Sequence, residues 1–278
     1  MKEIAQQFGS QAILSGVVTI PEKRDKTRPA LIILNSGVRH HVGCCRMSVK
    51  LARAVAEHGV LTLRFDLSGI GDSPLRNDSL PYEQSSVEEA ISAMDFLEQT
   101  LGINKFVFYG LCSGAYLGFK VAQLDTRVIG VAQVDGYAYR TPRFYFKHYT
   151  PRLFDKNVWR NLIFHRIPNM IRKSAGVKAS RPEFEIQEWP DPPSKAIVEK
   201  GYRLLVERRL KMLMFYTGGV KYEYNYQNQF FDMFSRVDFA DLVTLSFLPD
   251  ASHILREQES QDHVTDFLVR WIDEFHCC

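Results

Sequence analysis

The chain has 278 residues, 45% of them hydrophobic and 24% charged, which is typical of a soluble globular protein and excludes a disordered or fibrous one. No apolar run reaches the roughly eighteen residues of a membrane span, and the N-terminus lacks a basic region followed by an apolar stretch, so a cytoplasmic location is expected. The five cysteines lack the spacings of a zinc site or a disulfide framework, and neither a metal nor a cofactor is expected.

Positive charge is concentrated in one part of the chain. Residues 140–181 hold eleven Lys or Arg and one acid, Asp155, a local balance of +10, whereas the net charge of the whole chain is +3. The rest of the chain therefore carries −7. A basic surface attracts acidic partners, although the solvated face of ordinary helices accounts for such a run equally well.

Short apolar runs bounded by turn residues predict the strands. These runs are residues 12–20, 30–37, 59–66, 105–109, 128–135, 211–216 and 242–248. The later ones are continuous in apolar residues, as expected of a sheet that is covered on both faces. Because helical patterns separate the runs, we expect an α/β protein with a mostly parallel, doubly wound sheet.

Three amphipathic helices lie between and after these strands. The first ends at Gly59, a typical C-cap residue. Ser86 and Glu89 have the spacing of a capping box, which predicts that the second helix begins there and continues to Gly102. The third helix closes the chain.

Between residues 140 and 205 the alternation breaks into aromatic and basic segments. We interpret this part as a helical cap insertion over a core formed by residues 1–139 and 206–278. The aromatic residues among its charges are expected to pack the cap rather than to bind a ligand.

Cys112 has the sequence context of a nucleophile elbow. The predicted strand at 105–109 runs directly into GLCSGA, where a helical pattern begins. An elbow needs very small residues two positions before and two after its nucleophile, and Gly110 and Gly114 supply them for Cys112. For Ser113 the first of these positions would be Leu111, which would clash. The register therefore selects the thiol, although a small buried cysteine at a tight turn would match the same pattern.

His253 is the candidate general base, because it follows the last predicted strand and precedes the final helix. The acid that orients it is less clearly marked. Asp135 ends the strand at 128–135 and is preferred, with Glu223 as the rival, while capping of the following turn is an equally good role for Asp135. His253 and Asp135 would form a Cys–His–Asp triad with Cys112.

An oxyanion needs two backbone donors. We expect one from Ser113, the residue after the nucleophile, and the other from Val38 in the loop after the strand at 30–37.

NSGVRHHVG, RFDLSGIGDS, GLCSGA and a late histidine, in this order, resemble the α/β-hydrolase superfamily over nearly the whole chain outside the insertion. Within it, the cysteine elbow is similar to the exosortase-associated hydrolases and to the aminoacyl or acyl shuttle enzymes of nonribosomal peptide pathways. Dienelactone hydrolases also have such an elbow. The resemblance implies the pair Cys112 and His253, whereas the uncertain acid departs from the usual pattern.

Thiolate attack on a thioester exchanges bonds of nearly equal energy, which suits acyl transfer as well as hydrolysis. The expected function is therefore an acyltransferase or thioesterase that forms an acyl-cysteine intermediate. Its partners would be an acyl thioester on coenzyme A or on an acidic carrier protein docking on residues 140–181, and not nucleic acid, because no nucleic-acid motif accompanies the charge. Two alternatives stay open: a small-molecule ester or lactone hydrolase, and a non-catalytic binding protein that keeps the elbow as a relic.

Overall fold

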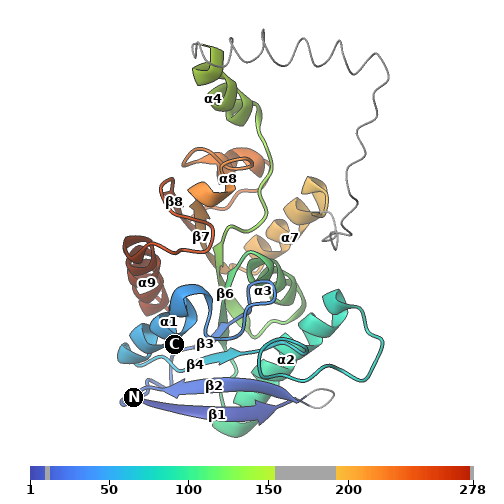
Figure 1. Cartoon of the computed structure of the whole chain (residues 1–278), viewed down its shortest axis with the longest axis vertical. Coiled ribbons are helices and arrows are strands. Elements are labelled where there is room, and N and C mark those ends of the chain that lie inside the picture. Colours follow the sequence, from blue (N-terminus) through green and yellow to red (C-terminus); the bar gives the residue numbers. More distant parts are fainter. Residues whose placement is uncertain (10–12, 154–191, 276–278) are drawn as a thin grey trace, which may run out of the picture.

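The computed structural model describes residues 1–9, 13–153 and 192–275, and these form an eight-stranded sheet with the order β1-β2-β4-β3-β5-β6-β7-β8 (Figure 1). The strands are β1 (Lys2–Phe8), β2 (Leu14–Ile20), β3 (Ala30–Ile33), β4 (Thr62–Phe65), β5 (Phe106–Leu111), β6 (Val128–Val134), β7 (Lys211–Thr217) and β8 (Val243–Leu248). β2 pairs antiparallel with both β1 and β4, and the other neighbouring strands pair parallel. The predicted mostly parallel α/β sheet is confirmed.

Helices cover both faces of the sheet, so each face has its own apolar core (Figure 1). α1 (Met47–Glu57) and α9 (Gln258–Asp273) pack on one face, and α2 (Tyr82–Leu101), α3 (Ser113–Leu124) and α7 (Lys195–Glu207) pack on the other. The central strand β5 is buried at all six positions, which explains its continuous apolar sequence. Residues of β5 belong to both cores, and its carboxyl end leads directly into Cys112.

Smaller elements surround that end of the sheet. They are the short 3-10 segments η1 (Cys44–Arg46) and η3 (Gly218–Val220) and the helices α4 (Pro142–Leu153) and α8 (Gln229–Met233). Among the described residues, no helix is both long and apolar enough to cross a membrane.

The start of α2 differs from the sequence prediction. The helix begins at Tyr82 after Pro81, so Ser86 and Glu89 lie within it and form no capping box. The Glu89 carboxylate instead accepts hydrogen bonds from the backbone and the hydroxyl of Ser68, and it pairs with Arg76. The capping-box prediction was wrong because Glu89 has better partners in the loop after β4.

β1 is a strand that the sequence patterns did not predict. Its sequence, KEIAQQF, has polar residues at most positions, and only Phe8 is buried. An edge strand with one solvated face needs little apolar sequence, and pairing with all seven residues of β2 holds it in place.

The predicted cap insertion at 140–205 is described only at its two ends. α7 packs against α3, and its side chains Val198, Tyr202 and Leu205 belong to the core, so the predicted boundary at residue 205 falls inside a core-packed helix. Residues 154–191, with most of the basic region, lie outside the described residues. The division into core and cap stays a prediction.

Candidate active site

Cys112 lies between β5 and α3 with φ 54° and ψ −114°, a strained backbone conformation for a residue with a side chain. Its N–H donates to the carbonyl of Val134, and its carbonyl accepts from Tyr116 at the start of α3. The turn therefore presents a half-buried thiol at the N-terminus of a helix.

The two glycines around Cys112 are required by the close approach of neighbouring backbone. A Cβ on Gly110 would lie 2.2 Å from the carbonyl carbon of Gly114, and a Cβ on Gly114 would lie 2.5 Å from the carbonyl oxygen of Asn35. Leu111 is buried against the apolar core. The chain therefore adopts the predicted strand, sharp turn and helix, with Cys112 at the turn.

His253 and Asp135 come together from loops far apart in the sequence. The Nδ1 atom of His253 lies 2.7 Å from Oδ2 of Asp135, whose side chain is fully buried. Asp135 directly follows β6, and His253 lies between β8 and α9. A Cβ on Gly219 would lie 2.2 Å from the backbone nitrogen of His253, so this glycine lets the histidine loop approach β7.

Hydrogen bonds to Asp135 and then to Cys112 raise the pKa of His253 from 6.5 to about 10, although partial burial opposes the charge. The imidazole thus contacts the thiol on one side and a buried carboxylate on the other. This order of groups can remove a proton from Cys112 and stabilise the imidazolium that forms.

Glu223, the rival acid, does not take the place of Asp135. It lies four residues beyond Gly219, and burial raises the pKa of its carboxyl, an effect that Arg140 opposes. The thiol of Cys112 and the carboxylate of Glu223 both contribute to a raised pKa of Tyr116, behind the larger effect of burial. Both groups thus act on Tyr116, but it is Asp135 that the structure brings to His253.

The two expected oxyanion donors belong to segments that contact each other. The N–H of Gly37 donates to Oγ of Ser113 over 2.7 Å, which ties the loop after β3 to the elbow. Within the described residues, the backbone N–H groups of Val38 and Ser113 have no acceptor. Both are thus free to donate to a substrate oxygen.

The chain was compared with protein families, curated proteins and solved structures. No family model matches the chain, and no curated protein does. Solved structures do match over nearly the full length: the α/β hydrolase GrgF from Penicillium sp. sh18 has a TM-score of 0.60 at 15% identity, covering 99% of this chain and 98% of its own.

Two further structures agree with this result. An α/β serine hydrolase homologue from Coxiella burnetii has a TM-score of 0.58 at 16% identity and covers 97% and 96% of the two chains. Proline iminopeptidase from Mycobacterium smegmatis has a TM-score of 0.57 at 16% identity and covers 98% and 99%. The chain has the α/β-hydrolase fold. At these identities the likeness shows the fold alone, and it does not place the chain in a cysteine-dependent branch.

In this α/β-hydrolase fold, Thr217 at the end of β7 is a site residue that the sequence analysis missed. Its N–H and its hydroxyl each donate to a different oxygen of Asp135, both over 2.7 Å. These bonds fix the carboxylate that faces His253. A polar residue at the carboxyl end of a buried parallel strand was the available signal.

Asn35 and Asp66 form a second missed set of contacts, behind the oxyanion loop. The amide of Asn35 donates to Asp66 and to the carbonyl of Arg39, and its oxygen accepts from the N–H of Leu67. The Nδ1 atom of His41 lies 2.7 Å from Asp66. Asp66 thus joins the loop after β3 to the loop after β4.

His41, Asp66 and Asp72 also place their possible ligand atoms within 4.8 Å of one another. Both oxygens of Asp66 already accept hydrogen bonds, among them one from the N–H of Asp72. These contacts explain the cluster as part of the loop structure.

Proposed function

We propose that this chain is an acyl-transfer enzyme that forms an acyl-cysteine intermediate on Cys112. The observation that supports it is the buried Asp135 hydrogen-bonded to His253, whose imidazole in turn contacts the thiol at the elbow. In this proposal Cys112 is the nucleophile, His253 the general base and acid, and Asp135 the orienting group.

The reaction has two steps with the same groups. With the proton of the pair held on His253, the Cys112 thiolate attacks the acyl carbonyl carbon, and the oxyanion accepts hydrogen bonds from the N–H groups of Ser113 and Val38. The intermediate then collapses, the leaving thiolate takes the proton from His253, and the acyl group stays on Cys112. In the second step His253 deprotonates an acceptor thiol or water, which attacks the acyl-cysteine and releases the thiolate of Cys112.

Thioesters are the proposed substrates because transfer of the acyl group from one thiol to another changes the free energy little. Transfer from an oxygen ester to Cys112 would be uphill, because the acyl-cysteine thioester is less stable than the ester. The acyl or aminoacyl group would arrive on coenzyme A or on a carrier protein. This assignment to a cysteine-dependent branch rests on the register of Gly110, Cys112 and Gly114, which supports the thiol rather than Ser113 as nucleophile.

Intact-mass spectrometry tests the proposal directly. After mixing with acetyl and aminoacyl thioesters, the protein should gain one acyl mass, and Cys112→Ala should abolish the gain. Cys45→Ala is the matched control, because Cys45 is an exposed free thiol that should leave the adduct in place. An adduct that survives Cys112→Ala, or no adduct with any thioester or activated ester, would contradict the proposal.

A small-molecule ester or lactone hydrolase is the second candidate, because the fold neighbours include proteins described as hydrolases. The same residues would serve, with water as the only acceptor. Rapid turnover of p-nitrophenyl esters without an added thiol would favour hydrolysis, whereas turnover that depends on a thiol acceptor would favour transfer. A non-catalytic binding protein is the third candidate, and the contact of His253 with Cys112 counts against it.

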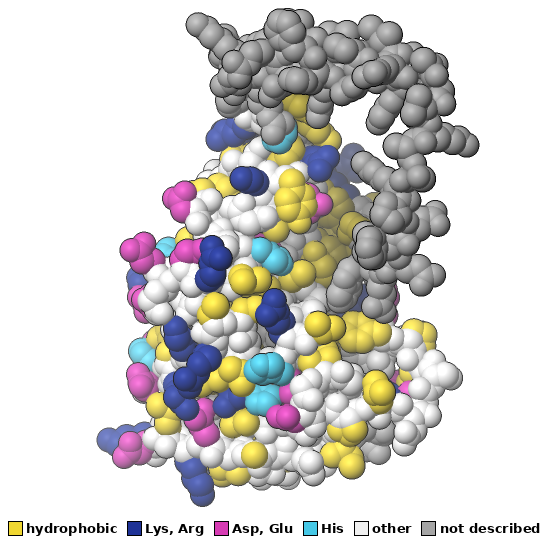
Figure 2. All heavy atoms as spheres, viewed as in Figure 1, with side chains coloured by type: hydrophobic (Ala, Val, Ile, Leu, Met, Phe, Trp, Pro, Cys, Tyr) yellow, Lys and Arg dark blue, Asp and Glu magenta, His cyan; other side chains and the backbone are white. Residues whose placement is uncertain are grey.

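We also propose that an acidic carrier protein docks on the basic region 140–181. Arg143 and Lys147 of α4 lie over the Tyr226 ring, and the Arg143 side chain is 60% exposed. Figure 2 shows Lys and Arg side chains among hydrophobic ones at the top of the described surface, around α4. The rest of the region lies outside the described residues. A cytoplasmic location remains a prediction.

A further inference from the structure

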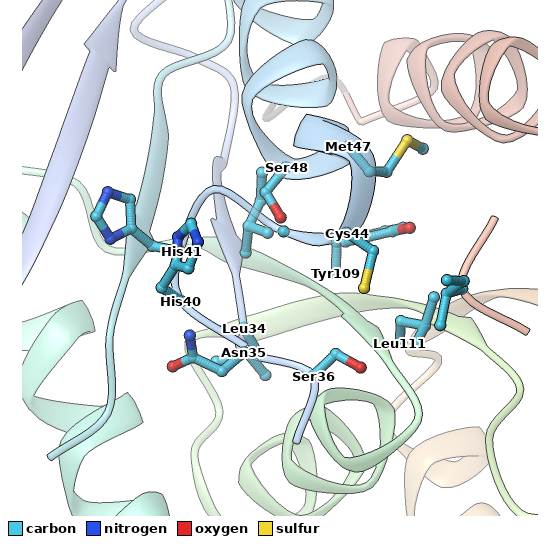
Figure 3. Close-up of a pocket in the computed structure, with 13 residues that line it drawn as sticks. Leu34, Asn35, Ser36, His40, His41, Cys44, Met47, Ser48, Tyr109 and Leu111 are labelled. Atoms are coloured by element: carbon cyan, nitrogen blue, oxygen red, sulfur yellow. The ribbon is translucent and has the colours of Figure 1, made fainter. Parts of the chain in front are cut away.

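A pocket opens beside the elbow on the α1 side of the sheet (Figure 3). The space that the centre of a water-sized sphere can reach in it is small, about 30 Å³, and the pocket is open to solvent on one side. The ends of β3 and β5, the η1 segment and the residue after His253 form its walls. The lining residues that matter here are Ser36, Cys44, Met47, Tyr109, Leu111 and Ile254.

This pocket shares its walls with the proposed catalytic groups. Leu111 directly precedes Cys112, and Ile254 directly follows His253. Ser36 begins the loop that carries the expected oxyanion donor. A chain attached to the sulfur of Cys112 is therefore next to the pocket.

Tyr109 points to a ligand in the pocket. Its side chain is only 3% exposed, and its hydroxyl has no hydrogen-bond partner among the described residues. Burial, and then the nearby carboxylate of Asp135, raise the pKa of Tyr109, so the hydroxyl keeps its proton and remains a donor. A buried donor without an acceptor costs free energy, and an acceptor in the pocket would recover it.

Cys44 and Ser36 supply two more neutral polar groups. In Figure 3 the sulfur of Cys44 points into the space beside the Ser36 hydroxyl. Burial raises the pKa of Cys44, although Arg39 opposes this, so the group is a neutral thiol. Cys45 and Arg46 have φ of 51° and 61°, and this strained turn holds η1 against the pocket.

The pocket walls contain no Lys, Arg, Asp or Glu, and besides Tyr109 their titratable rings are His40 and His41. His41 is already bound to Asp66. A charged ligand group would lose its hydration without finding an opposite charge, whereas apolar walls such as Met47 and Leu111 favour a hydrocarbon chain.

We propose that this pocket binds the acyl chain of the substrate, and that it selects a short uncharged chain with one hydrogen-bond acceptor facing the Tyr109 hydroxyl. The proposal rests on the proposed acyl-cysteine function. It adds the chemical class of the acyl group and names Tyr109 as the residue that determines specificity.

The test compares the kcat/KM of butyryl, 2-hydroxybutyryl and 3-hydroxybutyryl thioesters of N-acetylcysteamine. The wild type should prefer one hydroxyacyl thioester over butyryl, and Tyr109→Phe should lower that preference about five- to tenfold by removing one hydrogen bond. Tyr202→Phe is the matched control, since it removes another buried hydroxyl without a partner in the described chain, from the opposite face of the sheet. It should change the preference by less than about twofold.

A second pair of variants tests the volume of the pocket. Cys44→Met should lower the kcat/KM of hexanoyl thioester about tenfold more than that of acetyl thioester, because the longer side chain occupies the space of the acyl chain. Cys45→Met, at the exposed neighbouring position, should leave the ratio of the two unchanged.

An unchanged hydroxyacyl preference in Tyr109→Phe overturns the proposal. The proposal is also overturned if the effect of Tyr109→Phe on kcat/KM depends on which thiol leaves and not on which acyl group is transferred. Absence of any acyl adduct on wild-type Cys112 refutes the proposed function instead. In that case methyl 3-hydroxybutyrate and Cys112→Ala protein test the pocket by saturation-transfer NMR. A signal that Tyr109→Phe abolishes supports the pocket, and no signal, or one that persists in Tyr109→Phe, overturns it.

Discussion

Asp135 should be the acid on which activity depends, because its carboxylate holds His253 by Nδ1 and is itself held by Thr217. Asp135→Asn removes the charge that stabilises the imidazolium, so we expect kcat for acyl transfer to fall about 100-fold or more. Glu223→Gln is the matched control and should lower kcat less than about tenfold, since Glu223 does not orient the histidine. Steady-state kinetics with one thioester measures kcat for both variants. A larger loss of kcat in Glu223→Gln than in Asp135→Asn would make Glu223 the orienting acid.

The raised pKa of His253 makes folding stability depend on pH. The pKa moves from 6.5 to about 10, first because of Asp135 and then because of Cys112. The folded state therefore binds this proton more tightly, and the stabilisation is fully present below about pH 6.5 and is lost as the pH rises to about 10. The difference in free energy of unfolding between wild type and His253→Gln should shrink over that range in denaturant titrations. A difference that stays constant or grows would contradict the assignment.

At the scale of residues, the sequence predicted the site residues that belong to a local pattern. Glycine spacing predicted the turn at Cys112, and chain order singled out His253. No local sequence pattern identifies Thr217 or Asn35, because their roles arise only when parallel strands place them beside Asp135 and Asp66. The choice between Asp135 and Glu223 likewise needed the three-dimensional positions of the two loops.

The junction of β5 and α3 should tolerate no side chain at Gly114. Its Cβ would lie 2.5 Å from the carbonyl oxygen of Asn35, a backbone atom that cannot move away without displacing the loop after β3. Gly114→Ala should therefore lower the free energy of unfolding by about 2 kcal/mol or more. The Cβ of Gly118→Ala, also in α3, would meet only side-chain carbons, the nearest being Cβ of Phe108 at 3.3 Å and Cδ1 of Leu34 at 3.5 Å. This variant should change the free energy of unfolding by less than about 1 kcal/mol. Thermal and denaturant unfolding compare the two variants, and equal effects would contradict the close approach.

At the scale of elements, strands buried on both faces were predictable, and elements at the edges were not. β5 and β6 are nearly continuous in apolar residues because helices cover both their faces. β1 has one solvated face and polar residues at most positions, so its sequence resembles a loop. The start of α2 was misplaced because Glu89 accepts hydrogen bonds from Ser68, in the loop after β4. A local capping pattern contains no information about such a distant partner.

At the scale of the whole molecule, the parallel sheet explains why distant residues form one site. Parallel strands end at the same edge, so the segments that follow them meet there. The residues gathered in this way are Asn35 after β3, Cys112 after β5, Asp135 after β6, Thr217 at the end of β7 and His253 after β8. The fold class was predictable from strand and helix alternation, and this convergence follows from the fold.

The uneven charge of the chain should control how fast a carrier protein binds. Residues 140–181 carry +10 within a chain of net charge +3, so their field attracts an acidic carrier while the remainder of the chain repels it. Raising the salt from about 50 to about 500 mM should lower the kcat/KM of an acyl-carrier thioester about tenfold, because the longer-range part of this attraction is screened. The same acyl group on N-acetylcysteamine, which carries no charge, should show less than about a twofold change.

Charge reversal then locates the surface that gives this effect. Arg143→Glu with Lys147→Glu on α4 should lower kcat/KM for the carrier thioester and weaken its salt dependence, while the N-acetylcysteamine thioester is processed as before. Arg209→Glu is the matched control, because Arg209 is 72% exposed but lies two residues before β7, at the edge of the sheet opposite to the active site. An equal loss in Arg209→Glu would mean that net charge rather than the region at α4 guides the carrier, and no loss in either variant would remove the reason for placing the carrier there.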